Sequence, residues 1–421
     1  MKKSILAASV GTVALAGLAW AAAGGMGFGN FGGNGGGAVL LPASSQGVAA
    51  SSPVVQASPA AAGDGVQLAA DGKHIVDAYI CVFRAGAVGR GNERAEANRS
   101  ANAASGSVGH VYAHALQGFS IHASARGVEQ MQRNNSRIDY CEQDQVMALV
   151  NPIEALAKPG GGGGGGGTQP VEITPPGITQ VNGGISGATG TAWVIDTGIS
   201  LTHPDLNVDA GRSRNFVANE SSPNDLNGHG SHVAGTIAGI DNTIGTVGVA
   251  AGAKVVAVRV LNAQGSGTNA GVIAGVDYVA SVGVAGDVAN MSLGGGISQA
   301  LDDAVVRAST VVKFALAAGN DGGDANLHSP ARANGQNIFT IAAFSPHTGL
   351  WASFSNFGKP PVDYAEPGVS IFSTWLNGGY NTISGTSMAT PHAAGILLLG
   401  GIRNGGTVTR IAGDNYIKGV H

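Results

Sequence analysis

The stretch Gly385-Thr386-Ser387-Met388-Ala389-Thr390-Pro391-His392 places a serine between a glycine and an apolar, alanine-rich run that continues to Leu399. A helix that begins here leaves its first backbone N–H groups without partners, and such groups stabilise negative charge. A serine at this position suits a nucleophile whose reaction creates an oxyanion. Taken alone, the stretch also fits a Ser or Thr cap on a buried helix, because these residues are common caps.

A serine nucleophile needs a base within hydrogen-bond reach and an acid that orients the base. Residues 190–198, GTAWVIDTG, predict a buried parallel strand that ends in Asp196, at the sheet edge where α/β folds bind ligands. Residues 227–236, NGHGSHVAGT, place the glycine-flanked His229 at the start of a small-residue helix. The candidates therefore follow the chain order Asp196, His229, Ser387.

The three segments together resemble the catalytic signatures of the subtilisin-like serine proteases (subtilases), over about residues 170–400. Within these motifs the only departure is Ser231, where the family usually has Thr. The resemblance implies that Ser387 is the nucleophile and that His229 is the general base and then the general acid. Asp196 would orient the imidazole and stabilise the imidazolium.

Further segments match the family's oxyanion hole and substrate cleft. Asn320, which follows the apolar run 311–319, matches the amide that binds the oxyanion together with the backbone N–H of Ser387. Two glycine-rich edges match the strands to which an extended peptide adds; they comprise Ser292, Leu293 and Gly294, and Gly265, Ser266 and Gly267. The implied substrate is a peptide or protein, although each edge alone also fits an ordinary turn.

Asp205 and residues 240–246 resemble the family's tight calcium site. The implied ligands are the side chains of Asp205 and Asn242 and the carbonyls of Ile240, Ile244 and Thr246, a set of hard oxygens that suits Ca²⁺. Asp363 resembles a ligand of a second, weaker cation site, and Glu172 is a further candidate for the first. A loop with Asx turns is the alternative for both. No catalytic cofactor is expected. His229 and His232 share a helix face, but no third ligand at suitable spacing supports zinc.

Composition limits the partners and the location. Only 11% of the residues are charged, against roughly 25% in ordinary globular domains, and the net charge is −4 without a basic stripe, so nucleic acid is not an indicated partner. Residues 1–23 carry Lys2 and Lys3, an apolar run and Ala19-Trp20-Ala21, typical of a secretory signal peptide cleaved near Ala21. Left uncleaved, this segment is long enough for a membrane anchor. We expect an extracellular or periplasmic protein.

Low-complexity segments divide the rest of the chain. Residues 24–70 read as a Gly/Ala/Ser/Pro-rich spacer, and residues 151–170, with eight consecutive glycines, read as a linker. The segment between them, 71–150, has the β-α-β-β-α-β order of a ferredoxin-like fold. It resembles the inhibitory propeptide of subtilases in its GFSIHAS and EQDQV stretches, which implies autocleavage near Val150. An unrelated small α+β domain is the alternative.

The two cysteines, Cys81 and Cys141, fall in the first and last strands of this small domain. These strands are neighbours in a ferredoxin-like topology, so a disulfide is compatible with the fold and with an exported compartment. Two buried thiols are the alternative. The segment 171–421 contains no cysteine, which excludes a thiol enzyme.

For residues 171–421 we predict a doubly wound, mostly parallel α/β sheet with the triad at the carboxyl ends of its strands. Because the chain runs only about twenty residues past Gly400, the family's usual C-terminal helices are expected to be shortened. The predicted function is a monomeric, secreted serine endopeptidase made as a self-processing zymogen. The rival hypotheses are an inactive subtilisin-fold binding protein and a membrane-tethered maturation protease with one dedicated substrate.

Overall fold

The computed structural model describes residues 67–70, 72–149 and 169–421. The predicted signal segment, most of the predicted spacer, the expected cleavage position Val150 and nearly all of the predicted linker lie outside these ranges. Across the described ranges, no helix combines the length and the apolar character that crossing a membrane requires.

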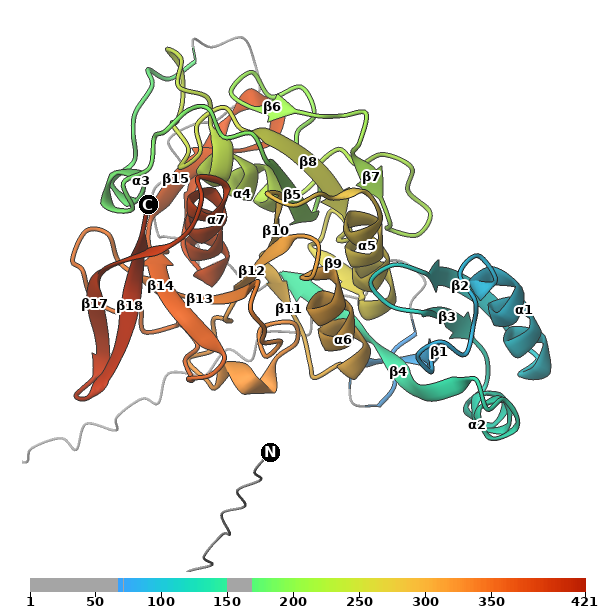
Figure 1. Cartoon of the computed structure of the whole chain (residues 1–421). Helices are drawn as coiled ribbons and strands as arrows, with labels where there is room; N and C mark the ends of the chain where they lie inside the picture. Colours follow the sequence, from blue (N-terminus) through green and yellow to red (C-terminus); the bar gives the residue numbers. More distant parts are fainter. Residues whose placement is uncertain (1–66, 71, 150–168) are drawn as a thin grey trace, which may run out of the picture. The chain divides into compact units, whose positions relative to one another are not determined.

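The first part of the chain folds as the predicted β-α-β-β-α-β domain (Figure 1). Its elements are β1 (His74–Phe83), α1 (Glu93–Ala103), β2 (Ser107–Tyr112), β3 (Gly118–His122), α2 (Ala125–Asn134) and β4 (Ile138–Leu149). The strands form an antiparallel sheet in the order β4-β1-β3-β2. Helix α2 begins after Ser124, whose hydroxyl accepts the N–H of Gly127 as an N-cap.

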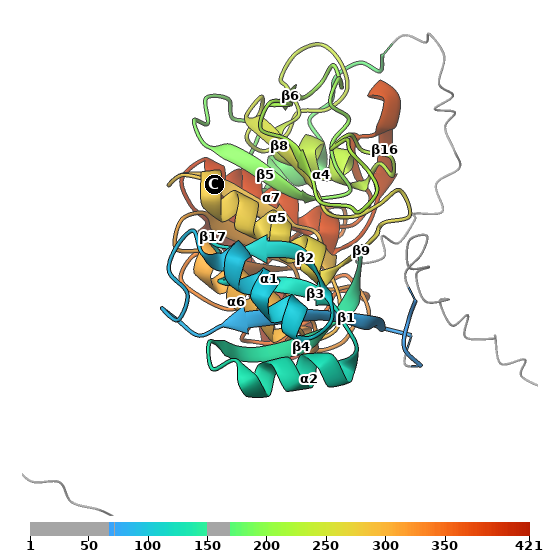
Figure 2. The ribbon, with the colours of Figure 1, turned by 90° about the vertical axis from the view of Figure 1, so that its right-hand side faces the viewer.

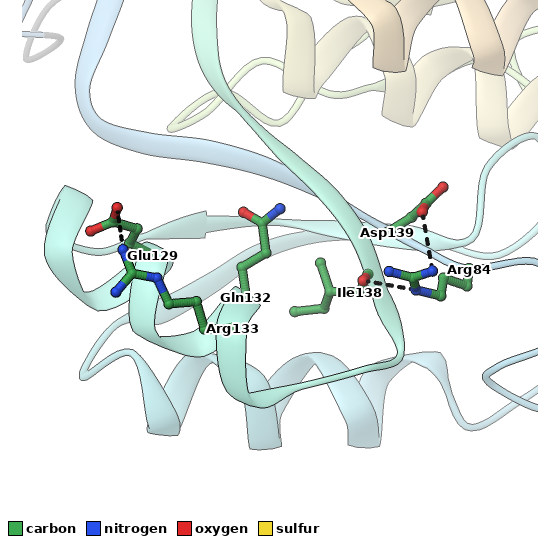
Figure 3. Close-up of a pocket in the computed structure, with 6 residues that line it drawn as sticks. All are labelled: Arg84, Glu129, Gln132, Arg133, Ile138 and Asp139. Carbon is green, nitrogen blue, oxygen red and sulfur yellow. Dashed lines mark hydrogen bonds and ion pairs between the residues drawn. The ribbon is translucent and has the colours of Figure 1, made fainter.

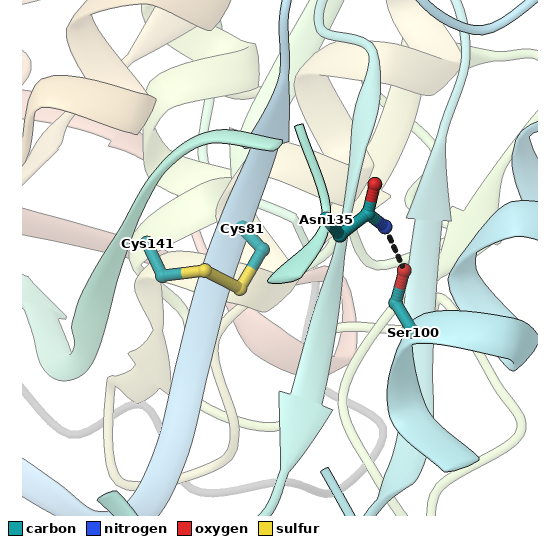
Figure 4. The surroundings of a disulfide bond; sticks show 4 residues. All are labelled: Cys81, Ser100, Asn135 and Cys141. Carbon is teal, nitrogen blue, oxygen red and sulfur yellow. Dashed lines mark hydrogen bonds between the residues drawn. A yellow bond between two sulfur atoms is a disulfide. The ribbon is translucent and has the colours of Figure 1, made fainter. Parts of the chain in front are cut away.

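The two cysteines of this domain form a disulfide, one of the two states that the sequence left open. Cys81 on β1 and Cys141 on β4 lie directly opposite each other in the antiparallel register and are bonded at 2.08 Å (Figure 4). Close by, the Asn135 amide donates to the Ser100 hydroxyl at 3.0 Å and joins the end of α2 to α1. The strand that continues toward the large domain is thus covalently fixed to the centre of the small sheet.

The second part of the chain is built on a mostly parallel sheet in the order β17-β18-β14-β13-β12-β10-β5-β8-β6, with β7 paired to β8. Its strands are β5 (Thr191–Asp196), β6 (Asn207–Val208), β7 (Arg214–Asn215), β8 (Lys254–Arg259), β10 (Val288–Met291), β12 (Lys313–Ala317), β13 (Ile338–Phe344), β14 (Val362–Pro367), β17 (Arg403–Ile411) and β18 (Asp414–Val420). Every residue of β5 is buried, as expected of a central strand covered on both faces.

Helices cover both faces of this sheet, so the fold is doubly wound as predicted. Helices α4 (His229–Ala238) and α7 (Thr386–Leu398) pack on the face that carries Ala192 and Val194. Helices α5 (Asn269–Val282) and α6 (Gln299–Ala308) pack on the face that carries Trp193 and Ile195. The remaining elements are α3 (Pro176–Gln180), β9 (Ser266–Thr268), β11 (Leu293–Gly294), the hairpin β15 (Ile371–Thr374) and β16 (Tyr380–Ile383), and the 3-10 turns Ala325–Leu327 and Leu376–Gly378.

The small domain packs its open sheet face on α5 and α6, while α1 and α2 cover the opposite face (Figures 1 and 2). Buried side chains of both domains form one continuous apolar cluster at this contact, which includes Ile80, Tyr112, Met147, Ile273 and Leu301. The two domains therefore share part of their hydrophobic core.

The C-terminal end departs from the expectation of shortened helices. No helix follows Leu398 in the described chain; instead β17 and β18 form a hairpin that extends the main sheet beside β14. A two-residue turn joins them, with Gly413 at φ 84°, a conformation that glycine adopts readily. Val408 of β17 and Tyr416 of β18 lie opposite each other and are both buried, which holds the hairpin against the sheet.

Candidate active site

Asp196 and His229 form a buried hydrogen-bonded pair. Asp196 is the last residue of β5 and His229 the first residue of α4, and His229 Nδ1 lies 2.8 and 3.0 Å from the two oxygens of Asp196. Within the described residues, the other ring nitrogen of His229 has no hydrogen-bond partner. The carboxylate thus orients the ring through Nδ1, and Nε2 is the nitrogen on the far side of the ring.

Asp225, which the motifs do not single out, fixes the turn in front of His229. Among the described residues, this buried carboxylate accepts five hydrogen bonds of 2.7–2.9 Å; the donors are Thr197 Oγ1, the N–H groups of Asn227, Gly228 and Ser231, and Ser231 Oγ. Since Thr197 follows Asp196, the carboxylate ties the end of β5 to the start of α4. An acid just before a helix start is a capping signal that could have identified it.

Ser387 is the second residue of α7, which packs against α4. Its Oγ donates to the carbonyl of Ser292 at 3.2 Å, and its own carbonyl accepts from Ser292 Oγ at 2.9 Å. Asn290 Nδ2 donates in turn to Ser292 Oγ at 2.9 Å. Ser292 was predicted to lie on the cleft edge. Its side chain also supports, by these hydrogen bonds, the turn that carries Ser387.

Asn320 and the Ser387 backbone converge on one small space. Asn320 Oδ1 accepts from both the N–H and the hydroxyl of Thr386 at 2.8 Å, so the amide orientation is fixed. A Cβ placed on Gly385 would lie 2.9 Å from Asn320 Nδ2 and 3.6 Å from Ser387 N. Gly385 therefore keeps side-chain atoms away from Asn320 Nδ2 and Ser387 N, two donors of the kind that an oxyanion hole uses.

The two predicted cleft edges are both paired to the end of β4. Met147 and Ala148 lie opposite Gly267 and Ser266 of β9, and Ala148 and Leu149 lie opposite Gly294 and Leu293 of β11. On the same edge as β9, the carbonyl of Gly265 accepts the N–H of Leu149 at 2.9 Å. The chain's own segment 146–149 is therefore the middle strand between the two edges.

A cavity of about 210 Å³ adjoins this strand and Asn320. Its walls are mostly small residues; they include Leu149, Gly294, Gly295, Ala317, Ala318, Gly319, Asn320, Asp321, His328 and Ala331. The Asp321 and His328 side chains approach to 3.3 Å. Six of the ten described lining residues are glycine or alanine, so much of the wall is backbone.

A second hollow, of about 380 Å³, lies entirely on the small domain (Figure 3). Arg133 pairs with Glu129 at 2.8 Å and Arg84 with Asp139 at 3.9 Å, and all four side chains are largely exposed. The described residues of this hollow hold no buried polar group that would form a binding site.

His232 and His392 lie in the packed interior near the site. Both are fully buried; His232 Nε2 contacts the carbonyl of Ile371 and His392 Nδ1 that of Met388, each at 2.9 Å. Burial lowers the pKa of His232 to about 3 and that of His392 to about 4. Neither ring is charged at neutral pH.

The residues of the expected calcium site come together around Asp205, a buried carboxylate. Asn242 Nδ2 and the N–H of Thr246 each donate to it at 2.9 Å, and Glu172 accepts the N–H of Asn242. Burial, followed by the nearby charge of Glu172, raises the pKa of Asp205. No donor in the described part of the chain bonds the carbonyls of Ile240, Ile244 and Thr246. Two acids and unbonded carbonyls are a donor set that fits a hard cation.

The second expected cation site, at Asp363, has less support from the structure. Asp363 is an exposed residue of β14 and accepts the N–H of Thr340 at 2.9 Å. No cluster of three or more His, Cys, Asp or Glu suited to a metal occurs in the ranges that the structure describes. Around Asp363 the structure therefore gives no support beyond the sequence.

Three acidic residues join the small domain to the large one. Asp277 of α5 accepts the N–H groups of Ala113, His114 and Ala115 of the small domain at 2.7–3.2 Å. From the other side, Glu142 of β4 accepts the N–H groups at the start of α6, at 3.0 and 3.3 Å, and Asp144 of β4 accepts one at the start of α5, at 3.2 Å. Carboxylates are favourable at helix N-termini.

Comparison with known proteins identifies the family of the chain. The subtilase family pattern matches residues 193–400. Alkaline serine exoprotease A of Vibrio alginolyticus is 39% identical over 343 residues, which cover 79% of this chain and 62% of that protein. The extracellular serine proteinase of Thermus sp. (strain Rt41A) is 39% identical over 309 residues, which cover 73% of this chain and 71% of that protein. A solved structure of a cold adapted subtilisin-like serine proteinase is 45% identical, covers 54% of this chain and 84% of its own, and has a TM-score of 0.49.

The doubly wound sheet, the buried Asp–His pair at the start of α4 and the serine at the start of α7 are features of a serine protease of the subtilisin type. The chain belongs to the subtilase family.

Proposed function

We propose that the protein is a secreted serine endopeptidase in which Ser387 attacks the peptide carbonyl and His229 Nε2 takes the Ser387 proton. The observation that carries this proposal is the 2.8 Å bond between His229 Nδ1 and Asp196, which orients the ring and stabilises its charged form. His229 then gives the proton to the leaving amine. Water hydrolyses the acyl-enzyme by the same route.

Asn320 Nδ2 and the Ser387 N–H would hold the oxyanion of the tetrahedral intermediate. The Thr386 bonds to Asn320 Oδ1 support this role, because they fix the amide before the reaction begins. In subtilisin, a member of this family, removing one such donor lowers kcat roughly 100- to 1,000-fold. A comparable loss is expected for Asn320→Ala.

Substrates would be peptides or proteins that bind as an extended strand between β9 and β11. The pairing of residues 146–149 with both edges supports this binding mode, since it uses main-chain hydrogen bonds and no particular sequence. The cavity beside Asn320 would take an apolar side chain of the substrate.

The small domain would act as an inhibitory propeptide. Its last described residues fill the cleft, and the next residue, Val150, is where we place autocleavage. A bound product strand blocks other substrates until the domain dissociates. Secretion and cleavage near Ala21 are part of the same proposal, and N-terminal sequencing of the exported protein separates it from the membrane-tethered alternative.

Calcium would be held by Asp205, Asn242 and the carbonyls of Ile240, Ile244 and Thr246. Its contribution is structural: it would neutralise the buried Asp205 and cross-link the loop after α4. Binding requires Asn242 to present its amide oxygen in place of the NH₂ group. If calcium binds here, EGTA lowers the melting temperature of the Ser387→Ala protein and has no effect on Asp205→Asn, Ser387→Ala. Equal effects on both proteins would contradict the assignment.

Intact mass of the exported wild type and of Ser387→Ala, after incubation with calcium, tests the function. Cleavage between the two domains in the wild type alone supports a self-processing protease. Cleavage of both proteins assigns processing to another protease. Cleavage of neither favours an inactive binding protein.

A further inference from the structure

The loop that carries Asn320 is held along its length by a second segment, 354–357. The carbonyl of Phe354 accepts the N–H of Gly322 at 2.8 Å, and the N–H of Phe357 donates to the carbonyl of Gly323 at 3.0 Å. The oxyanion residue therefore lies on a loop whose position depends on this neighbour. Such support matters because a donor displaced by about 1 Å can lower the rate about 100-fold.

At the centre of the second segment, Asn356 bonds on both sides of Asn320. Its backbone N–H donates to the carbonyl of Gly319 at 2.9 Å, one residue before Asn320. Its side-chain Oδ1 accepts the N–H of Asp321 at 3.1 Å, one residue after Asn320, and the N–H of Gly323 at 2.9 Å. Asn356 is fully buried, so these bonds have little competition from water.

The chain makes room for this side chain with a glycine. A Cβ on Gly319 would lie 2.2 Å from Asn356 Nδ2, and Gly319 has φ 114°, a conformation that other residues rarely adopt. The Asn356 amide therefore packs directly on the backbone that leads into Asn320. Its Nδ2 has no hydrogen-bond partner among the described residues, so the side chain forms its hydrogen bonds there through Oδ1.

We propose that Asn356 is a positioning residue for the oxyanion hole: it clamps the backbone on both sides of Asn320, while Thr386 fixes the Asn320 amide itself. Asn356 does not reach the reacting atoms in this role. It acts through Asn320, and it also places Asp321 at the wall of the cavity. The inference rests on the proposed function, because it assumes that Asn320 binds the oxyanion.

The test is a double-mutant cycle on the full chain, with the rate of self-cleavage measured by intact mass. This reaction is intramolecular, so its rate does not depend on substrate affinity. Asn356→Leu keeps the side-chain volume roughly the same and removes the acceptor. Asn356→Ser is a milder variant, used if the leucine variant of the protein melts below the assay temperature. Asn337→Leu is the matched control, because Asn337 also joins two loops, at 2.9 Å to the Ser309 carbonyl, but at the opposite end of β13.

We expect Asn356→Leu or Asn356→Ser to slow self-cleavage roughly 10- to 100-fold in the wild-type background. In the Asn320→Ala background the same change is expected to slow it less than about threefold, because the shared step is already lost. Binding of a peptide aldehyde, which forms an oxyanion-like adduct, weakens in parallel. The control leaves the rate unchanged in both backgrounds.

Equal slowing in the two backgrounds would overturn the proposal and make Asn356 a general structural residue, as would no slowing in the wild-type background. Absence of self-cleavage in the otherwise unaltered protein would instead contradict the proposed function. The two failures are thus distinguishable.

Discussion

The carbonyl oxygen of Ser387 accepts a hydrogen bond from the hydroxyl of Ser292 at 2.9 Å. In a regular helix this carbonyl would accept the N–H four residues later, but that residue is Pro391, which has no N–H. The proline in α7 therefore leaves an acceptor open at the nucleophile, and Ser292 of a neighbouring segment satisfies it. The serine turn is consequently joined to the cleft edge.

Ser292→Ala should lower the free energy of unfolding by about 1–3 kcal/mol, since it leaves a buried carbonyl unsatisfied. Urea unfolding in the Ser387→Ala background measures this loss without autolysis. Adding Pro391→Ala supplies the missing N–H and should restore part of the stability. A double variant no more stable than Ser292→Ala would contradict this account of the proline.

Asp225→Asn should lower kcat/KM by about 100-fold, because an amide nitrogen cannot accept the bonds that Ser231 donates and the start of α4 loses its tie to β5. Peptide hydrolysis by the matured enzyme measures the effect. Asp287→Asn is the matched control: Asp287 is also buried and accepts the N–H of Thr191 and the indole N–H of Trp193, at the other end of β5. Equal losses of activity per folded molecule would contradict a role for Asp225 at the site.

Replacing both Cys81 and Cys141 by alanine should destabilise the small domain by about 4 kcal/mol, the chain-entropy value for a bridge of 60-residue separation. Hydrogen exchange of β1 and β3 in the Ser387→Ala protein, with and without the bridge, measures this. Reduction of the unaltered chain with dithiothreitol should reproduce the result. Unchanged exchange would mean that packing alone holds the domain.

The features that could be predicted from the sequence are those that require particular residue types close together in the chain. The Asp196, His229 and Ser387 motifs combine a catalytic side chain with the glycines and apolar runs that place it at a strand end or helix start. The alternation of apolar segments likewise predicted the doubly wound sheet. Both are local patterns, so one chain suffices to find them.

The parts that could not be predicted depend on contacts between distant segments. The sequence could mark Asp225 only as an acid shortly before a helix start and carries no signal for Asn356, and only the fold shows which N–H groups donate to their side chains. The glycines next to Ser292 indicate a strand edge that binds a peptide. They do not indicate that the Ser292 hydroxyl bonds the Ser387 carbonyl, because that bond depends on the position of α7. The C-terminal hairpin carried a signal in its Ala412-Gly413 turn, but its partner strand β14 lies far away in sequence.

Docking of the small domain should weaken as the pH rises from about 4 to about 7. Burial at the start of α5 raises the pKa of Asp144 from its ordinary 3.8 to about 7, and burial also raises that of Glu142. Docking therefore takes up protons. A group whose pKa is higher in the docked state favours docking below its undocked pKa, and this contribution is lost as the pH rises to its docked pKa.

The measurement uses the Ser387→Ala chain with a specific protease site in place of the glycine run 160–167, cut after folding. Its two domains then dissociate at a rate that can be followed from pH 4 to pH 8, and we expect the rate to increase up to about pH 7 and to level off above it. Asp144→Asn should reduce the pH dependence to the part that Glu142 contributes, because the amide does not titrate. Asp139→Asn, an exposed neighbour on the same strand, should leave the profile as it is. Dissociation that slows toward pH 7 would show that the helix N-terminus outweighs burial at Asp144.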